Sequence, residues 1–281
     1  MTRAGYHSGR DRSHTHGDGT LTLGWRWAVF QASRLVGRGL IAATRALTYA
    51  AAGILEREQL GRAIAGRWGQ WGLDERYALL GLFGWEEPFV RRFLKPDDRI
   101  LIVGSGSGRE VIALRRDGYN VEGLEPAAAA AELSQQIMKK AGVEARIRIG
   151  GIETVQLDGA FDLFIFSWYC YSYIAHRPTR VAVLRSARDH LAPGGRIILS
   201  YITGEPIPKR LPVRLGVLAA RASRAGWRPD RNDVLSFEPG GLHFEHHFAP
   251  GEVEDEARAA GLKVAALQLG DDGLIALIAD E

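Results

Sequence analysis

The chain has 281 residues, 46% hydrophobic and 25% charged, which is enough apolar surface for a folded core and excludes disorder throughout. The net charge of only +3 does not by itself indicate a polyanionic partner. No apolar stretch reaches the length of a membrane span, about 18 residues. Cys170 is the only cysteine, which excludes an internal disulfide and a zinc site built on cysteines, and fits a cytoplasmic location.

The N-terminal part of the chain changes composition after its first residues. Residues 1–20 are rich in Gly, Ser, Thr, His and Arg and predict a disordered tail. Residues 21–60 predict a basic amphipathic helical extension, in which Arg34, Arg38 and Arg45 fall on one face. Such a helix either docks on an anionic membrane surface or packs on its own domain. The pattern leaves both alternatives open.

Residues 61–281 predict a single α/β domain with an insertion at about residues 204–250. Short helices are expected within residues 56–98, and strands then alternate with helices. The expected strands are residues 99–103, 120–124, 145–149, 161–166, 196–201, 263–267 and 273–278. This alternation is typical of a mostly parallel sheet covered by helices in three layers. The last two strands are separated by a short turn and should form an antiparallel hairpin.

A glycine-rich turn follows the first expected strand. Gly104, Gly106 and Gly108 alternate with serines, and the next residue is Arg109. Glycine lets the backbone turn tightly and lets a ligand lie against bare peptide groups. A dinucleotide-binding turn would have a third glycine where Arg109 stands, so a pyrophosphate cofactor is disfavoured. The alternative is a tight turn with a purely structural role.

A carboxylate ends the second expected strand. Glu125 lies at the position where a carboxylate can accept hydrogen bonds from both hydroxyls of a ribose. The alternative is a surface carboxylate at the start of a helix, favoured by the helix dipole. The glycine turn at the neighbouring strand end favours ribose binding.

From about Arg62 to its end, the chain resembles the class I S-adenosylmethionine-dependent methyltransferases. The resemblance rests on residues 103–108 (VGSGSG), 123–126 (GLEP), 161–167 (FDLFIFS) and 191–199 (LAPGGRIIL). It implies a Rossmann-like methyltransferase fold, a seven-stranded sheet whose last strand is antiparallel, and S-adenosylmethionine as cofactor. Many family members carry an acid where this chain has Ile102, and often another at the position of Gly151.

The resemblance also implies a set of residues that contact the cofactor. Those expected at its methionine part are Gly104, Ser105, Gly106 and Gly108, and Glu125 is expected at the ribose. Those expected near the adenine or beside the cofactor are Pro126, Ile152, Glu153, Ser167 and Trp168. No metal site is expected.

Two segments are candidates for the acceptor side. The aromatic residues around Tyr169 either line an acceptor pocket or pack at a strand end, and Tyr169 is a weak catalytic candidate. Residues 242–248 read as a strand with His243, Glu245 and His247 on one face. His247 is a weak candidate for the base of a hydroxyl acceptor. The alternatives are a polar strand face and one side of a metal site.

A second basic amphipathic segment lies in the insertion. Arg210, Arg214 and Arg221 are expected opposite an apolar face that includes Leu211 and Leu218. We therefore expect methyl transfer to a small-molecule or lipid-like acceptor, more at oxygen than nitrogen. The alternative is a non-catalytic methyltransferase-like protein that docks on a membrane surface or protein partner. No nucleic-acid motif appears, and the pattern indicates no oligomeric state.

Overall fold

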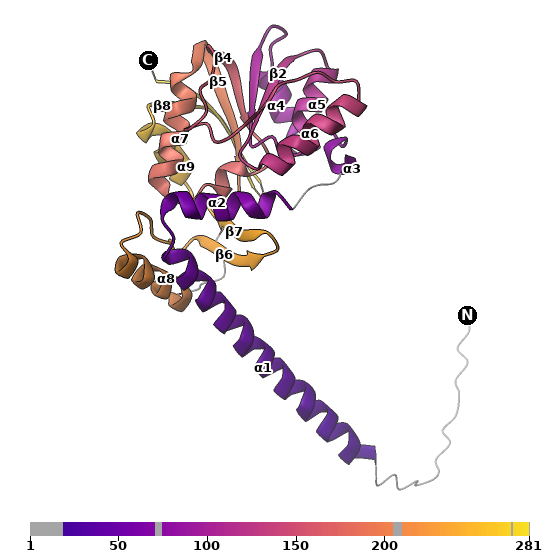
Figure 1. Ribbon diagram of the computed structural model, residues 1–281, viewed down its shortest axis with the longest axis vertical. Coiled ribbons are helices and arrows are strands. Elements are labelled where there is room, and N and C mark those ends of the chain that lie inside the picture. Colours follow the sequence, from indigo (N-terminus) through magenta and orange to yellow (C-terminus); the bar gives the residue numbers. More distant parts are fainter. Residues whose placement is uncertain (1–18, 71–74, 205–209, 271, 281) are drawn as a thin grey trace, which may run out of the picture. The chain divides into compact units, whose positions relative to one another are not determined.

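The computed structural model describes residues 19–70, 75–204, 210–270 and 272–280. Nearly all of the predicted tail therefore lies outside the described residues. The chain divides into two compact units, residues 1–44 and 45–281. The first helix, α1 (Gly19–Gly53), is continuous through this division (Figure 1). The predicted helical extension ended at residue 60, whereas residues 45–60 belong to the second unit.

The second unit is built on a seven-stranded sheet in the order β3-β2-β1-β4-β5-β9-β8. Its strands are β1 (Arg99–Val103), β2 (Asn120–Glu125), β3 (Ile147–Ile149), β4 (Phe161–Phe166), β5 (Leu191–Tyr201), β8 (Leu262–Leu269) and β9 (Gly273–Ala279). The helices are α2 (Arg57–Trp68), α3 (Glu75–Ala78), α4 (Glu87–Phe93), α5 (Arg109–Arg116), α6 (Ala128–Lys140), α7 (Arg177–Asp189) and α9 (Glu252–Ala259), with a 3-10 turn η1 (Cys170–Tyr173).

Strand alternation produces the three layers. In β1, Leu101 and Val103 pack with residues of α7 and α9, whereas Ile100 and Ile102 pack with residues of α4, α5 and α6. Figure 1 shows the helices on the two faces of the sheet. Successive side chains of a strand point to opposite faces, so a continuous apolar run fills both cores. This confirms the expected three-layer α/β fold.

The sheet topology places a ligand site at one edge. β1 pairs in parallel with β2 on one side and with β4 on the other. The connection that follows β1 leads to β2 on one side of it, and the chain later returns as β4 on the other side. The two connections diverge, which opens a crevice at the carboxyl ends of these strands. β9 runs antiparallel to both β5 and β8, which confirms the predicted hairpin and the antiparallel last strand.

The insertion is more regular than the sequence predicted. It contains α8 (Arg210–Ser223) and a separate two-stranded sheet of β6 (Asp233–Glu238) and β7 (Gly241–His246). A third apolar cluster joins this sheet to α2 and to the end of α1. It includes Tyr49, Leu60, Ile64, Trp227, Leu235 and Phe244. The insertion is thereby anchored to the helix that covers the crevice.

The apolar residues Leu211 and Leu218 expected on one face of α8 are not those that the helix buries. Leu211 and Leu218 are 64% and 59% exposed, while Gly216 and Ala220 are buried. A Cβ at Gly216 would lie 2.9 Å from the carbonyl oxygen of Tyr49. The backbones of α8 and the end of α1 therefore meet through small residues, and that close approach decides which face is buried.

Candidate functional site

A cavity of about 750 Å³ opens at the carboxyl ends of β1, β2 and β4. Its volume is that of a cofactor or small-molecule site. Nine of the ten predicted cofactor-binding residues line it, namely Gly104, Ser105, Gly106, Glu125, Pro126, Ile152, Glu153, Ser167 and Trp168. The fold thus brings together motifs that are far apart in the sequence.

The glycine turn forms the floor of the cavity at the end of β1. Gly104 and Gly106 have positive φ values of 71° and 52°. The amides of Gly104 and Ser105 donate to the carbonyl of Leu124 at 2.8 and 3.0 Å, which ties the turn to β2. A Cβ at Gly104 would lie only 2.8 Å from Cβ of Cys170. Only glycine fits this position in both conformation and space.

Glu125 is buried at the end of β2, with a side chain that still has room for a ligand. Its Oε2 accepts from the amide of Gly106 at 2.8 Å, and its Oε1 accepts from the amide of Ala127 at 2.8 Å. A carboxylate has about four acceptor positions, so about two remain. Burial raises the pKa of Glu125, and the two amide hydrogen bonds act in the opposite direction. The remaining positions can accept hydrogen bonds from a ligand.

Gly108 has a packing role that the sequence analysis did not predict. It is the tenth predicted cofactor residue and is not among those that line the cavity. It caps the N-terminus of α5 with a φ of 90°. A Cβ there would collide with the Ser134 hydroxyl. Gly108 therefore lets α5 and α6 pack closely.

The missing acid at Gly151 is compensated by its neighbour. A Cβ at Gly151 would lie 2.8 Å from both carboxylate oxygens of Glu153. The Glu153 carboxylate thus occupies the space into which a side chain at position 151 would extend. Ile152 between them is buried and also lines the cavity.

A buried ion network stands behind the glycine turn. Arg109 donates to Glu86 at 2.6 Å and to Glu110 at 2.5 Å. Glu110 also accepts from the Ser167 hydroxyl at 2.5 Å. Burial and the nearby Glu110 raise the pKa of Glu86. Two carboxylates thus share one guanidinium in a buried network that the sequence analysis missed.

Helix α2 covers the cavity, and the sequence analysis did not predict this. Leu60, Ile64, Ala65 and Trp68 line the cavity from one face of the helix. The Trp68 ring packs on Tyr173, with ring centroids 4.6 Å apart. The apolar i, i+4, i+8 spacing of Leu60, Ile64 and Trp68 was the available signal, because it marks one helix face.

The two weak catalytic candidates are not among the residues that line the cavity. The Tyr169 hydroxyl donates to Asp272 at 2.6 Å. His247 bonds Glu245 at 2.9 Å through Nε2, and His243 bonds the same carboxylate at 3.3 Å. Hydrogen bonds from these two histidines lower the pKa of Glu245 to about 2. The predicted face of β7 exists, but its polar groups bond one another. The catalytic roles of Tyr169 and His247 stay predictions.

Within the described part of the chain, no group of three or more His, Cys, Asp or Glu side chains is arranged to hold a metal ion. None of the described helices is long and apolar enough to cross a bilayer. Strand order, the glycine turn and the Glu125 carboxylate together place the cavity where Rossmann-like folds bind their ligands.

Known proteins share these features. Residues 100–195 match the sequence profile of a family described as a methyltransferase domain. A ribosomal protein L11 methyltransferase of Thermus thermophilus is 30% identical over 50% of this chain and 49% of its own length. A ubiquinone biosynthesis O-methyltransferase of Xanthomonas axonopodis is 26% identical over 74% of this chain and 79% of its own length. A solved S-adenosylmethionine-dependent methyltransferase of Methanosarcina mazei superposes with a TM-score of 0.56 at 18% identity, covering 72% of this chain and 100% of that one.

Residues 100–195 therefore carry a methyltransferase domain, and the chain shares its fold with solved S-adenosylmethionine-dependent methyltransferases. It spans about half the length of the L11 methyltransferase that it matches. The cofactor of this class has a ribose, an adenine and a methionine part, and the residues at Glu125, Ile152 and Gly104 suit these parts.

Proposed function

We propose that this protein transfers a methyl group from S-adenosylmethionine to an oxygen of a small-molecule acceptor. One observation carries the proposal: a single cavity joins the cofactor motifs to an aromatic wall. Gly104 and Glu125 lie on one side of it, and Trp68, Tyr77 and Tyr173 also line it. Two molecules held in one enclosed space react with a large advantage in proximity and orientation.

Different residues of the cavity would bind different parts of S-adenosylmethionine. Glu125 holds the ribose through its remaining acceptor positions, and Ile152 offers an apolar contact for the adenine. The bare backbone at Gly104 and Gly106 lets the methionine part approach the turn. S-adenosylmethionine, when bound, supplies an electrophilic methyl group. Leu60 and Ile64 of α2 exclude water from the space where the acceptor would lie.

Two observations support oxygen as the acceptor atom. The Xanthomonas relative is an O-methyltransferase and aligns over most of this chain. A hydroxyl must also lose its proton on methylation, and the acceptor side of the cavity contains a histidine, His176.

Calorimetric titration with S-adenosylmethionine tests the cofactor assignment. We expect micromolar binding by the unaltered protein and at least tenfold weaker binding, about 1.4 kcal/mol, by Glu125→Ala. Glu132→Ala is the control, because Glu132 is exposed on α6 and does not line the cavity. No binding by the unaltered protein would contradict the function. Equal binding by Glu125→Ala would contradict the role of Glu125.

We also propose that α1 docks on an anionic membrane surface, which brings the enzyme to a peripheral position. Trp25, Trp27 and Phe30 are between 50% and 61% exposed, and Leu35 and Leu40 are more than 60% exposed. The helix contains four arginines and no acidic residue. Exposed aromatic and aliphatic side chains with arginines are typical of helices that lie in a lipid interface. Vesicle flotation tests this second proposal.

A further inference from the structure

His176 has a position in the cavity that nothing in the sequence analysis marked. It lies between η1 and α7 and lines the cavity together with Tyr173, Ile174 and Thr179. Among the described histidines it alone lines this cavity. It is therefore the histidine best placed to meet an acceptor.

The backbone at His176 is strained. Its φ is 75° and its ψ is 116°, a conformation that side-chain-bearing residues rarely adopt. The carbonyl of His176 accepts from the amides of Thr179 at 2.9 Å and Arg180 at 3.2 Å. Strain of this kind persists only where the surroundings impose it, and it is concentrated at functional sites.

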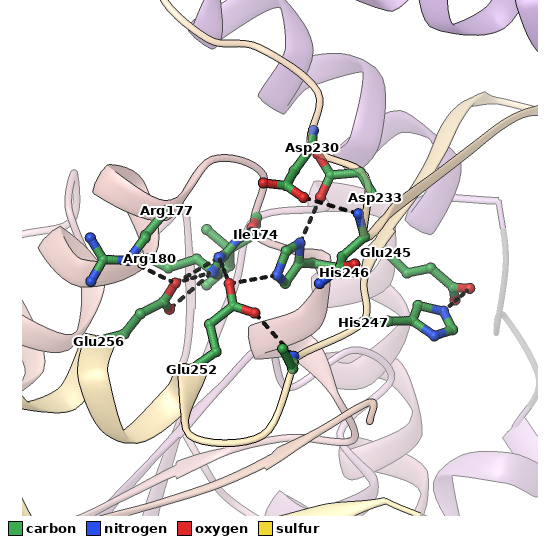
Figure 2. Close-up of polar contacts among 12 residues, drawn as sticks. Ile174, Arg177, Arg180, Asp230, Asp233, Glu245, His246, His247, Glu252 and Glu256 are labelled. Carbon is green, nitrogen blue, oxygen red and sulfur yellow. Dashed lines mark hydrogen bonds and ion pairs between the residues drawn. The ribbon is translucent and has the colours of Figure 1, made fainter. Parts of the chain in front are cut away.

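The segment that contains His176 is tied at both ends to one buried carboxylate. Before His176, the Tyr171 hydroxyl donates to Glu256 Oε2 at 2.6 Å. After it, Arg180 Nη2 bonds Glu256 Oε1 at 2.6 Å. Figure 2 shows Arg180 converging with Arg177 on Glu256, and with Glu252 beside it. Glu256 is fully buried in α9, so the short segment between the two anchors has little freedom.

The surroundings of His176 disfavour its charged form. Burial lowers its pKa, and the positive charges of Arg57 on α2 and Arg180 on α7 lower it further. Asp233 on β6 acts in the opposite direction with a smaller effect. Nδ1 is buried with no partner among the described residues, and the His176 side chain lines the cavity. A neutral ring with a free nitrogen can accept a proton.

We propose that His176 is the general base that takes the proton from the acceptor hydroxyl. This inference rests on the proposed methyl transfer. The acceptor oxygen gives its proton to the imidazole ring of His176 and forms a bond to the methyl carbon. The bond from that carbon to sulfur breaks, and its electron pair stays on sulfur. The histidine then releases its proton to water. The ordinary pKa of a histidine, about 6.5, lies closer to that of a phenol, about 10, than to that of an aliphatic alcohol, so a phenolic acceptor fits better.

Activity on defined acceptors tests the role of His176. The assay follows transfer of labelled methyl from S-adenosylmethionine to catechol, phenol and glycerol. We expect His176→Gln to lower kcat by at least a hundredfold on the phenolic acceptors while the calorimetric affinity for S-adenosylmethionine stays within twofold. Added imidazole should partly restore the rate of His176→Ala. The matched control is His190→Gln at the other end of α7, where Nδ1 bonds the Ser186 carbonyl.

The pH profile separates a base from a structural residue. In the unaltered protein, kcat should rise with unit slope at acidic pH and level off above the pKa of His176, and this limb should vanish in His176→Gln. A variant that loses cofactor binding together with activity, or a profile unchanged by the substitution, would overturn the proposal. A hundredfold loss of kcat in His247→Gln, with full activity in His176→Gln, would identify His247 as the base and would also overturn the proposal.

One measurement does not depend on the acceptor. Nuclear magnetic resonance titration of the histidine-labelled protein, with the signal assigned by its loss in His176→Gln, should give a pKa below 6.5 for His176. A value above 6.5 would overturn the proposal even if no acceptor in the panel is methylated. Absence of S-adenosylmethionine binding by the unaltered protein would instead contradict the proposed function, so the two failures are distinguishable.

Discussion

At the scale of single residues, the site depends on where a side chain is absent as much as on where one is present. Gly104 combines a positive φ with a close approach to Cys170, and Gly151 leaves space that the Glu153 carboxylate fills. Glu125 combines burial with two backbone donors. Each of these residues shapes the surface that the cofactor would contact, because the polar groups and the bare backbone lie within one cavity.

Gly104→Ala separates strain from steric exclusion when it is compared with Gly118→Ala. Both glycines have a positive φ, 71° and 91°, but a Cβ at Gly118 meets no atom within 4 Å. We expect Gly118→Ala to cost about 1 kcal/mol through strain alone and to keep cofactor affinity. Gly104→Ala should cost clearly more and bind S-adenosylmethionine at least tenfold more weakly. Urea unfolding and calorimetry measure the two effects, and equal behaviour of the variants would contradict the steric argument.

At the scale of elements, the insertion and the helix α2 act together. The turn between β6 and β7 packs directly on α2, since a Cβ at Gly66 would lie 2.6 Å from the Gly240 carbonyl oxygen. On the other side of the hairpin, His246 bonds Asp233 Oδ1 at 2.7 Å and Glu252 Oε1 at 2.9 Å (Figure 2). The β6–β7 hairpin is thus fixed to α9 through His246. Its turn packs on α2, the helix that covers the cavity.

The His246 bridge should make stability depend on pH. Burial opposes its charge, but the hydrogen bonds to Asp233 and Glu252 outweigh burial and raise the pKa of His246 to about 9. A histidine whose pKa is raised on folding stabilises the folded state fully below its unfolded pKa of about 6.5, and this contribution is lost as pH rises through 9. The contribution is about 3 kcal/mol.

Chemical unfolding at several pH values measures this effect. The free energy of unfolding should fall between pH 6.5 and 9.5, and His246→Gln should remove most of that slope. His190→Gln should keep it, because His190 makes no contact with a carboxylate among the described residues. A slope that survives in His246→Gln would show that another group carries the pH dependence.

At the scale of the whole molecule, the two compact units suit different tasks. All residues that line the cavity belong to residues 45–281. Residues 24–44 bury no large apolar side chain of their own. Such a helix needs a partner for its apolar surface, and its arginines favour an anionic lipid interface over a neutral one.

Flotation with vesicles of phosphatidylglycerol and phosphatidylcholine tests the docking of α1. The full chain should float with the anionic vesicles, less so at high salt. Arg34→Glu combined with Arg38→Glu should reduce the bound fraction at least tenfold. A chain that begins at Arg45 should stay in solution and still bind S-adenosylmethionine. A full chain that does not float, or that forms α1-dependent oligomers without lipid, would contradict the proposal.

Much of the fold could be predicted because its signals are local. Strand alternation, the glycine turn at Gly104 and the acidic end of β2 at Glu125 each lie within a few residues of sequence. Which face of α8 is buried could not be predicted, for the opposite reason. Leu211 and Leu218 have the periodicity of a buried face, but burial follows the backbone approach at Gly216.

The sequence by itself determined the order of strands and helices along the chain, the glycine turn after β1 and the carboxylate at the end of β2, because short-range periodicity and backbone conformation encode them. Only the tertiary structure decided that α2 covers the cavity, that Arg109 pairs with Glu86, and that His176 rather than His247 lines the cavity. These features join residues that are distant in the chain, and which surfaces meet depends on how the elements pack rather than on the pattern of any one of them.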